Sequence, residues 1–346
     1  MSPRTRRLGF AVKVLGVPGM KSNDSRRWAS NPHLKVSLEY LDQILDYLGR
    51  ARITMYRLSS DLAPYATHPD MPQFHGMVAE SARELQTIGD KAKQLGIRLS
   101  FHPSQYIILN SPDAELVKKS IADLVSQAEM LDRMELGPEA VLVIHVGGMY
   151  GDAATSRARW VETWHVLPEP VRRRLVLEND DLRFSAADVL WIHQHTGVRL
   201  VFDYQHFWCL NPERLDLRPT LASFVATWPD GVVPKVHFSS PRTEMREVKR
   251  KDKAGKTKPV LLPPVFTGHA DFCNPFEFAT FMRLAEGLDF DVMLEAKAKD
   301  LALIRLRGDL LRYAPDLAPQ FGVAPDEPTI AETQEIPAAE IEKEPA

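Results

Sequence analysis

The sequence is poor in cysteine and has no long apolar run. Its two cysteines, Cys209 and Cys273, cannot supply a disulfide framework or a clustered zinc motif, which favours a reducing compartment. No apolar segment approaches the roughly 20 residues of a membrane helix, and Lys13 interrupts the N-terminal apolar stretch that a signal peptide would need. We therefore expect a cytoplasmic protein with no membrane partner.

Charge is unevenly distributed along the chain, and acidic residues predominate at its end. Residues 316–346 hold eight acidic residues against one lysine, with few large apolar side chains, so we expect a disordered acidic tail. The formal net charge is −3 for the whole chain and −7 for this tail, so residues 1–315 carry about +4. We expect residues 1–315 to form one domain. A mildly basic domain permits a polyanionic partner without requiring one.

What the sequence does contain is a regular alternation of strand and helix patterns. Short apolar runs of strand length are separated by longer segments with helical periodicity. The expected strands are residues 8–15, 55–60, 98–103, 140–148, 174–178, 198–206, 233–240 and 291–297. Eight such units predict an α/β fold, and in about 310 residues a closed (β/α)8 TIM barrel fits better than an open sheet.

Capping residues predict where the intervening helices begin and end. Helices are expected to begin at Ser37, at Ser111 with Pro112, at Ser185, at Asn274 with Pro275 and at Asp300. One long helix is expected from about His75 to Gly96, and the helix that begins at Ser185 is expected to stop at Gly197.

Possible metal ligands stand at the C-terminal ends of the predicted strands. In a (β/α)8 barrel these strand ends meet on one face, so the side chains would share one cleft. The candidates are His102, His145, Glu178, Asp203, His206, His237 and Glu295, together with His269 from the loop after the seventh strand. One such residue alone is usually structural, whereas a divalent cation is the simplest reason for many imidazoles and carboxylates to share a cleft.

The eight candidate ligands are too many for one ion, and their types indicate which metals and which reaction to expect. Mixed imidazole and carboxylate donors suit Mn²⁺, Fe²⁺ or Zn²⁺ better than Mg²⁺. Several ions a few ångströms apart are a known device for hydrolysing phosphodiesters, which makes a nuclease the leading hypothesis. A sugar isomerase or epimerase on the same barrel would also gather these donors and remains the alternative; a metal-binding module without catalysis is the weaker third option.

Eight segments of the chain, between about Leu8 and Lys299, resemble the signature segments of the UV damage endonucleases. In order they are RLSSDLAPYATHP, FHPSQYIILNSP, HVGGMYGD, RLVLENDD, FDYQH, KVHFSSPR, HADF and DVMLEAKAK. The resemblance implies a barrel like those of the AP endonucleases and xylose isomerases. It also implies a DNA repair enzyme that cuts double-stranded DNA 5′ to UV photoproducts, namely cyclobutane dimers and 6-4 photoproducts, with an AP-directed endonuclease as an alternative. We expect a monomer.

The resemblance further implies a centre of three Mn²⁺ ions, with Zn²⁺ or Fe²⁺ as alternatives. Its ligands would be His102 and His145 for the first ion, Glu178 as a bridge, Asp203, His237 and Glu295 for the second, and His206 and His269 for the third. Catalytic roles would fall to Glu178, His237, Lys235 and His68, with Lys235 carboxylated or else a plain phosphate-contacting or structural lysine.

Further segments would contact the DNA. Gln105 and Tyr106 match a pair that probes the damaged dinucleotide, although Tyr106 could instead pack on the following helix. Arg57, expected after the second strand, and Arg242 are candidate phosphate contacts. Two positions depart from the family pattern: Phe10 stands where a tyrosine is usual, which puts a lesion contact there in doubt, and Gln205 stands where a second histidine is common.

A basic insertion at residues 242–262 lies outside the resemblance. Its residues 242–258 carry eight Lys or Arg against three acidic residues. The insertion is either a solvated loop or a clamp that neutralises DNA phosphates and makes binding salt-dependent.

Overall fold

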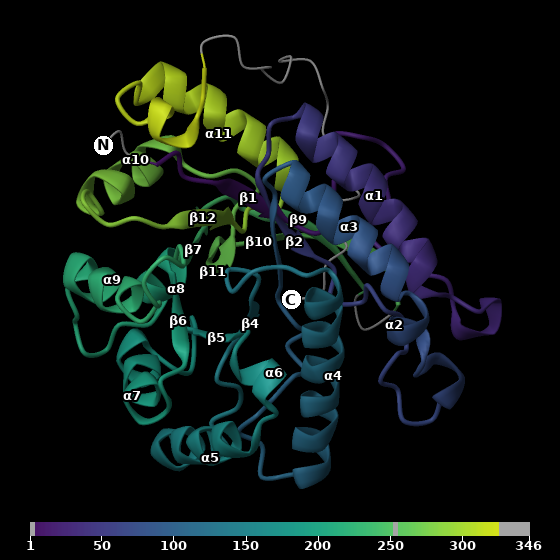
Figure 1. Ribbon diagram of the computed structural model, residues 1–346. Helices are drawn as coiled ribbons and strands as arrows, with labels where there is room; N and C mark the ends of the chain where they lie inside the picture. The colour runs from purple at the N-terminus through teal and green to yellow at the C-terminus, as the bar shows by residue number, and fades with distance from the viewer. Residues whose placement is uncertain (1–3, 252–254, 325–346) are drawn as a thin grey trace.

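The computed structural model describes residues 4–251 and 255–324, and its centre is a closed barrel of parallel strands. The strands run in the order β1-β12-β7-β6-β5-β4-β3-β2 around the ring. They are β1 (Leu8–Ala11), β2 (Met55–Leu58), β3 (Arg98–Phe101), β4 (Leu142–Ile144), β5 (Leu175–Glu178), β6 (Arg199–Asp203), β7 (Lys235–Phe238) and β12 (Asp291–Leu294). Figure 1 looks down this barrel, with the helices arranged around the strands. The predicted (β/α)8 fold is confirmed.

Helices follow the barrel strands and cover the outside of the ring. They are α1 (Leu34–Arg50), α2 (Met77–Glu80), α3 (Ala82–Gln94), α4 (Ala114–Arg133), α5 (Ala153–Val166), α6 (Glu169–Arg172), α7 (Ala186–Thr196), α8 (Tyr204–Cys209), α9 (Leu217–Val225), α10 (Pro275–Leu284) and α11 (Lys299–Tyr313). Short 3-10 turns lie at Trp28–Ser30, Pro72–Phe74 and Ala318–Phe321. None of the helices described is both long enough and apolar enough to cross a membrane.

The strands of the barrel are buried on both faces. Seven of the eight barrel strands have no residue even partly exposed; β2 has one, Arg57. Near-continuous apolar runs suit such strands, since helices cover one side and the barrel interior fills the other. Gly9 lets β1 approach β2, because a Cβ there would lie 2.8 Å from the Cβ of Met55. β1 is shorter than expected because Val12 adopts a left-handed φ of 65°.

Several helix boundaries differ from the predictions for local reasons. The Ser37 hydroxyl accepts from the Asp24 amide inside α1, which begins instead after His33, whose side chain accepts from Lys35 N. Asp113 rather than Ser111 caps α4, because its carboxylate accepts two amides of the first turn. The single helix predicted for residues 75–96 is wrong, since it is split into α2 and α3.

The other predicted boundaries agree with the structure. The helix between Ser185 and Gly197 is confirmed, with Asp188 Oδ2 accepting from Ser185 N and Gly197 at a φ of 72°. Asn274 caps α10 as expected. The last barrel helix, α11, begins one residue before the predicted Asp300.

The folded part continues beyond the boundary predicted at residue 315. Asp316 forms an ion pair with Arg283, and Phe321 is buried with its ring 5.5 Å from that of Phe278. Residues 316–324 therefore belong to the barrel domain. The rest of the predicted tail, residues 325–346, lies outside the described residues.

The insertion predicted as a basic loop contains regular structure. β9 (Arg246–Lys251) and β10 (Thr257–Leu262) pair antiparallel, and β8 (Pro241–Arg242) pairs with β11 (Val265–His269). Residues 252–254, between β9 and β10, lie outside the described residues. In Figure 1 the labels β9 and β10 stand next to the label β2.

A buried ion pair lies at the N-terminal end of the barrel. Arg98 at the start of β3 contacts Asp291 at the start of β12 at 3.0 Å, and neither side chain is exposed. Burial alone would raise the pKa of Asp291, but Arg98 and further arginines nearby hold it below its ordinary value. The pair therefore joins two strands that are distant in sequence.

Asp291→Ala is expected to lower the free energy of unfolding by about 3–5 kcal/mol, because the Arg98 charge stays buried without its partner. Chemical denaturation measures this. Asp289→Ala is the matched control, since Asp289 pairs with Arg4 at the surface and its side chain is 58% exposed. The control should lose only about 0–1 kcal/mol. Equal losses in the two variants would contradict a special role for the buried pair.

Candidate metal centre and cleft

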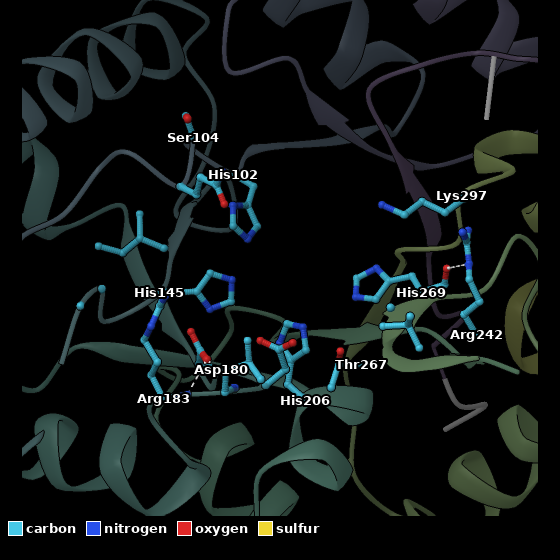
Figure 2. A pocket seen from close by; sticks show the side chains of 18 of the residues that line it. His102, Ser104, His145, Asp180, Arg183, His206, Arg242, Thr267, His269 and Lys297 are labelled. Atoms are coloured by element: carbon cyan, nitrogen blue, oxygen red, sulfur yellow. Dashed lines mark hydrogen bonds between the residues drawn. The ribbon is translucent and has the colours of Figure 1, made fainter. Parts of the chain in front are cut away.

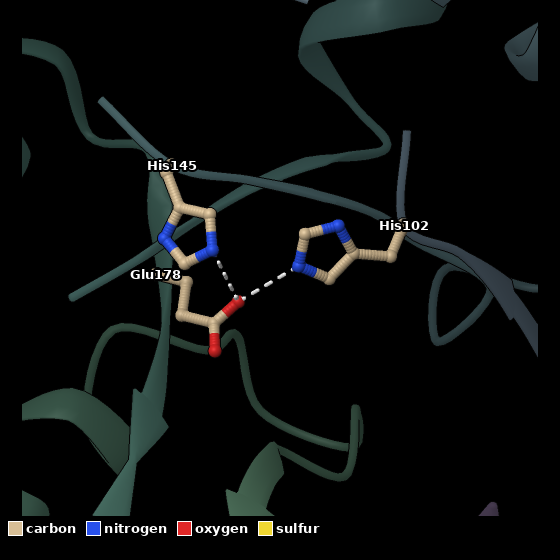
Figure 3. A group of neighbouring side chains, drawn as sticks. All are labelled: His102, His145 and Glu178. Atoms are coloured by element: carbon tan, nitrogen blue, oxygen red, sulfur yellow. Dashed lines mark hydrogen bonds and ion pairs between the residues drawn. The ribbon is translucent and has the colours of Figure 1, made fainter. Parts of the chain in front are cut away.

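Glu178 lies at the middle of the site, at the C-terminal end of β5. Its side chain is fully buried, and its Oε2 lies 3.1 Å from His102 Nε2 and 3.7 Å from His145 Nε2. Figure 3 shows the two imidazoles converging on this oxygen from β3 and β4. All three ligand atoms lie within 4.8 Å of one another, so they could hold one ion.

The other oxygen of Glu178 belongs to a second group. His237 Nδ1 lies 2.8 Å from Glu178 Oε1 and 3.3 Å from Glu295 Oε1. With Asp203 these residues form a buried set whose ligand atoms also lie within 4.8 Å of one another. One carboxylate is therefore shared between two sets of possible metal ligands.

Asp203 gives an independent sign of a cation in the second group. Its Oδ2 is buried and has no hydrogen-bond partner among the described residues. Burial raises the pKa of Asp203 to about 6, which His206 only partly opposes. A buried carboxylate oxygen without a donor costs free energy unless a cation compensates it, so the donor chemistry fits a bound metal ion.

His206 and His269 form a third pair beside these groups. Their ring centres are 5.8 Å apart. His206 donates from Nδ1 to the carbonyl of Asn179 at 3.0 Å, and His269 donates from Nδ1 to the carbonyl of Glu295 at 3.0 Å. These backbone contacts fix the tautomer and leave Nε2 of each ring available as a ligand.

The histidines of the site differ in the direction in which their surroundings shift the pKa. Burial alone would lower the pKa of His206, but Asp203 and Glu178 more than offset this and raise it to about 9. Burial lowers the pKa values of His145 and His269 to about 4, against a smaller opposing effect of nearby carboxylates. His145 and His269 are therefore neutral near pH 7 and ready to bind a cation, whereas His206 must first lose a proton.

Four of the donors line a cleft with a volume of about 1550 Å³, namely His102, His145, His206 and His269. The other four, Glu178, Asp203, His237 and Glu295, are buried and do not line it. Figure 2 shows His102 and His145 on one side of it, His269, Arg242 and Lys297 on the other, and His206 between them. Pockets for small ligands usually hold about 300–1000 Å³, so this cleft is large for a simple sugar. Gln105 and Lys249 also line it, which joins the loop after β3 and the β9–β10 hairpin across the same space.

Lys235 lies inside the barrel rather than in the cleft. It is 1% exposed, and its Nζ donates to Ser100 Oγ at 3.2 Å. Burial, followed by the charges of Arg98 and Arg57, holds the pKa of this amine well below its ordinary value. Glu178 and Glu295 oppose this lowering only in part, so the ammonium form of Lys235 is disfavoured beside the two buried glutamates.

The two candidate phosphate contacts already have acidic partners. Arg57 lies within β2, not after it as predicted, and forms an ion pair with Glu295. Arg242 lines the cleft and pairs with Asp271 at 2.9 Å and with Glu244 at 3.3 Å. Arg57 thereby becomes part of the charge balance around the second donor group.

Three further positions from the sequence analysis have distinct surroundings. Gln105 and Tyr106 are exposed in the loop after β3, and Tyr106 is 72% exposed, so it does not pack on the following helix. His68 is exposed in a turn, where its Nδ1 accepts from Asp70 N and its ring meets Tyr65 edge-on. Phe10 is fully buried against Tyr56, so it cannot contact a lesion.

Two residues that position ligands were missed by the sequence analysis. Asn179 exchanges two hydrogen bonds with the backbone of Asp203 and accepts from His206 through its carbonyl. Gln205 donates to the carbonyls of Phe266 and Gly268 and so holds β11, the strand that ends at His269. Asn179 and Gln205 adjoin the predicted ligands Glu178 and His206 in the sequence, and this could have indicated a positioning role. Their hydrogen-bond partners are distant in the sequence, so a local pattern does not show them.

Comparison with known proteins agrees with the fold and shows the family of the chain. The closed barrel is shared by a putative sugar phosphate isomerase/epimerase from Anabaena variabilis, at a TM-score of 0.50 and 11% identity, covering 95% of this chain and 93% of its own. Residues 28–318 match the UV-endonuclease UvdE family, and the chain belongs to that family.

Individual relatives cover most of the chain. The UV DNA damage endonuclease of Bacillus velezensis is 32% identical over 292 residues, 84% of this chain and 85% of the relative. That of Bacillus pumilus is 34% identical over 261 residues, 75% of each chain. The crystal structure of SacUVDE superposes with a TM-score of 0.72 at 29% identity and covers 89% of this chain and 98% of its own.

Proposed function

We propose that this protein is a metal-dependent DNA repair endonuclease that hydrolyses the phosphodiester bond 5′ to UV photoproducts, including cyclobutane dimers and 6-4 photoproducts. The observation that carries the proposal is the sharing of Glu178 between two donor groups, one of which includes His102 and His145 from the lining of a large cleft. Membership of the UV-endonuclease family and the names of the relatives support the same substrate. The cleft volume argues against a sugar isomerase, because a monosaccharide would leave most of it to water.

The donor chemistry fits three divalent ions, preferably Mn²⁺, with Zn²⁺ or Fe²⁺ as alternatives. The first would be held by His102, His145 and Glu178, the second by Glu178, Asp203, His237 and Glu295, and the third by His206 and His269. Bound there, the ions would supply an activated water and a charge that stabilises the phosphate oxygens.

The surrounding residues orient these ligands and balance their charge. Asn179 fixes both the Asp203 backbone and the ring of His206, while Gln205 fixes β11 below His269. The lowered pKa of Lys235 favours its reaction with CO2, which would release one proton and give an anionic carbamate beside Glu178 and Glu295. His68 would contact the phosphate or a water at the mouth of the site when DNA is bound.

Gln105 and Tyr106 are proposed to probe the damaged dinucleotide in double-stranded DNA. An exposed aromatic ring can enter a duplex where a lesion has weakened stacking, and an amide can donate to and accept from a displaced base. Arg57 and Arg242 would add positive charge near the scissile phosphate even though each has an acidic partner. We propose that the protein acts as a monomer in the cytoplasm. Its two cysteines are free thiols, as that compartment would keep them.

The β9–β10 hairpin is proposed to bind the DNA backbone. Lys249, Arg250 and Lys251 are exposed along β9, and Lys258 stands directly across from Arg250 in β10. Exposed cations of this kind can contact phosphates along a duplex. Arg246 and Lys249 line the cleft, so the hairpin lies beside the proposed path of the duplex.

The triple substitution of Lys249, Arg250 and Lys251 to alanine is expected to weaken binding to undamaged duplex and to make it less salt-dependent. The slope of log K against log salt should fall in magnitude by up to about 3, close to one for each lost phosphate contact. Fluorescence anisotropy across a salt series measures this slope.

The matched control removes three exposed cations from the opposite end of the barrel. Arg50, Lys93 and Arg172 lie near the C-terminal ends of helices that lead into β2, β3 and β5, far from the cleft mouth. Their replacement by alanine should leave the slope unchanged. A slope that falls equally in both triple variants would rule out a specific role for the hairpin.

A plasmid assay tests the proposed function. With Mn²⁺, the purified protein should nick UV-irradiated supercoiled DNA and spare unirradiated DNA, and an oligonucleotide with a single dimer should be cut on its 5′ side. Equal nicking of both plasmids would instead indicate a general nuclease, and preference for depurinated DNA an AP-directed one.

A further inference from the structure

The loop after β4 contains more than a metal ligand. It runs from His145 through the sequence VGGMYGD to Asp152, and of these residues the proposed metal centre uses only His145. Tyr150 in this loop lines the cleft and is 44% exposed. Its backbone has a φ of 46°, in the left-handed region that bulky residues avoid. An exposed tyrosine in a strained conformation gains little from burial, and such strain is typical of functional positions.

The ring of Tyr150 is supported from behind. A Cβ on Gly148 would lie 2.7 Å from Tyr150 Cε2, so the ring rests on the glycine backbone at a distance that only glycine allows. The guanidinium of Arg159, from α5, lies 5.6 Å from the ring centre. Arg159 is itself held by hydrogen bonds to the carbonyl of Asn110 at 3.0 Å and to Ser156 Oγ at 2.9 Å. The Tyr150 ring is therefore held between the Gly148 backbone and Arg159, and Arg159 is fixed by its own hydrogen bonds.

Asn110 connects this loop to the loop that carries Gln105 and Tyr106. Its Nδ2 donates to the carbonyl of Gly148 at 2.8 Å, and its Oδ1 accepts from Gly148 N at 3.2 Å. Gly147 makes room for this contact, because a Cβ there would lie 2.4 Å from Asn110 Oδ1. Tyr106 and Tyr150 thus stand on two loops joined by a pair of hydrogen bonds.

We propose that Tyr150 is a stacking surface for the nucleobase opposite the lesion, an inference that rests on the proposed function. When Tyr106 enters the stack at the lesion, the base across from it loses both its pairing and its stacking. A flat aromatic ring on a neighbouring, braced loop can receive that base, since every nucleobase has a face that stacks on an aromatic side chain. The Arg159 guanidinium on the ring adds a cation beside the DNA.

The test places 2-aminopurine opposite a cyclobutane dimer in a duplex whose linkage 5′ to the dimer is an uncleavable methylphosphonate. The probe is dim when stacked and bright when displaced without a stacking partner. The Mn²⁺-loaded wild-type protein should bind with the probe dim. Tyr150→Ala should weaken binding roughly tenfold or more and leave the probe several-fold brighter. Tyr150→Phe, which keeps the ring, should match the wild type in both readouts.

Gly148→Ala provides a second variant that keeps the tyrosine but displaces its ring. It should brighten the probe as Tyr150→Ala does, with its melting temperature confirming that the barrel is folded. Wild-type affinity and a dim probe in Tyr150→Ala would overturn the inference. The proposed function is judged separately: failure of the wild type to nick irradiated plasmid would refute the function, whereas nicking combined with an unaffected Tyr150→Ala would refute only the stacking role.

Discussion

Glu178→Gln is expected to reduce nicking of irradiated DNA by about 10³-fold or more while the barrel remains folded. Glutamine has the same size but no charge, and its NH2 group, which cannot bind a cation, replaces one of the two carboxylate oxygens. Because both donor groups include Glu178, a single substitution weakens both. Metal ions contribute several kcal/mol to such reactions, and each 1.36 kcal/mol corresponds to a tenfold change in rate.

The control for this variant is Glu277→Gln. Glu277 lies on α10, accepts from Ser240 Oγ at 2.5 Å and belongs to neither donor group. Nicking rates under single-turnover conditions, with melting temperatures for both variants, separate loss of chemistry from loss of folding. Glu277→Gln should retain a rate near that of the wild type. A Glu178→Gln rate within tenfold of the wild type would contradict the proposed centre.

Metal binding is expected to weaken about a thousandfold between pH 9 and pH 6. In the metal-free protein His206, with a pKa of about 9, is protonated at pH 7 and must release one proton before Nε2 can bind an ion. Apparent affinity for a cation at this site therefore falls about tenfold for each pH unit below 9. Below pH 6 the fall becomes steeper, because Asp203, with a pKa of about 6, is then protonated as well.

Calorimetric titration with Mn²⁺ in two buffers of different ionisation enthalpy measures both the affinity and the protons released. The wild type should release about one proton from this site at pH 7. His206→Asn should lose that release, since asparagine can still donate to the Asn179 carbonyl but carries no proton to expel. His193→Gln is the control, because His193 lies on α7 and donates to the Val198 carbonyl outside the donor groups. Binding without proton release in the wild type would refute the assignment.

The sequence predicted the barrel and the grouping of its donors because both follow from short-range patterns. Apolar runs of strand length alternate with helical segments, and each buried strand places its last residues at the same end of the barrel. The position of Glu178 at the end of an apolar run was therefore enough to place it beside His145 and His237, although they are separated along the chain. The His206 and His269 rings are also neighbours in the structure.

What the sequence did not predict depends on contacts between distant segments. The hydroxyl of Ser37 looked like a helix cap but is used by the Asp24 amide. Arg57 was expected after the second strand, but it lies within β2 and pairs with Glu295, more than two hundred residues later in the chain. The role of Gln205 in holding β11 likewise needs the folded geometry.

Anomalous diffraction from crystals grown with Mn²⁺ tests the central claim most directly, namely that the donors around Glu178 hold ions jointly. The account predicts anomalous peaks on both sides of the Glu178 carboxylate, one beside His102 and His145 and one beside Asp203, His237 and Glu295, and a further peak between His206 and His269. An absence of peaks at Glu178 in crystals of protein that nicks irradiated DNA would contradict the account.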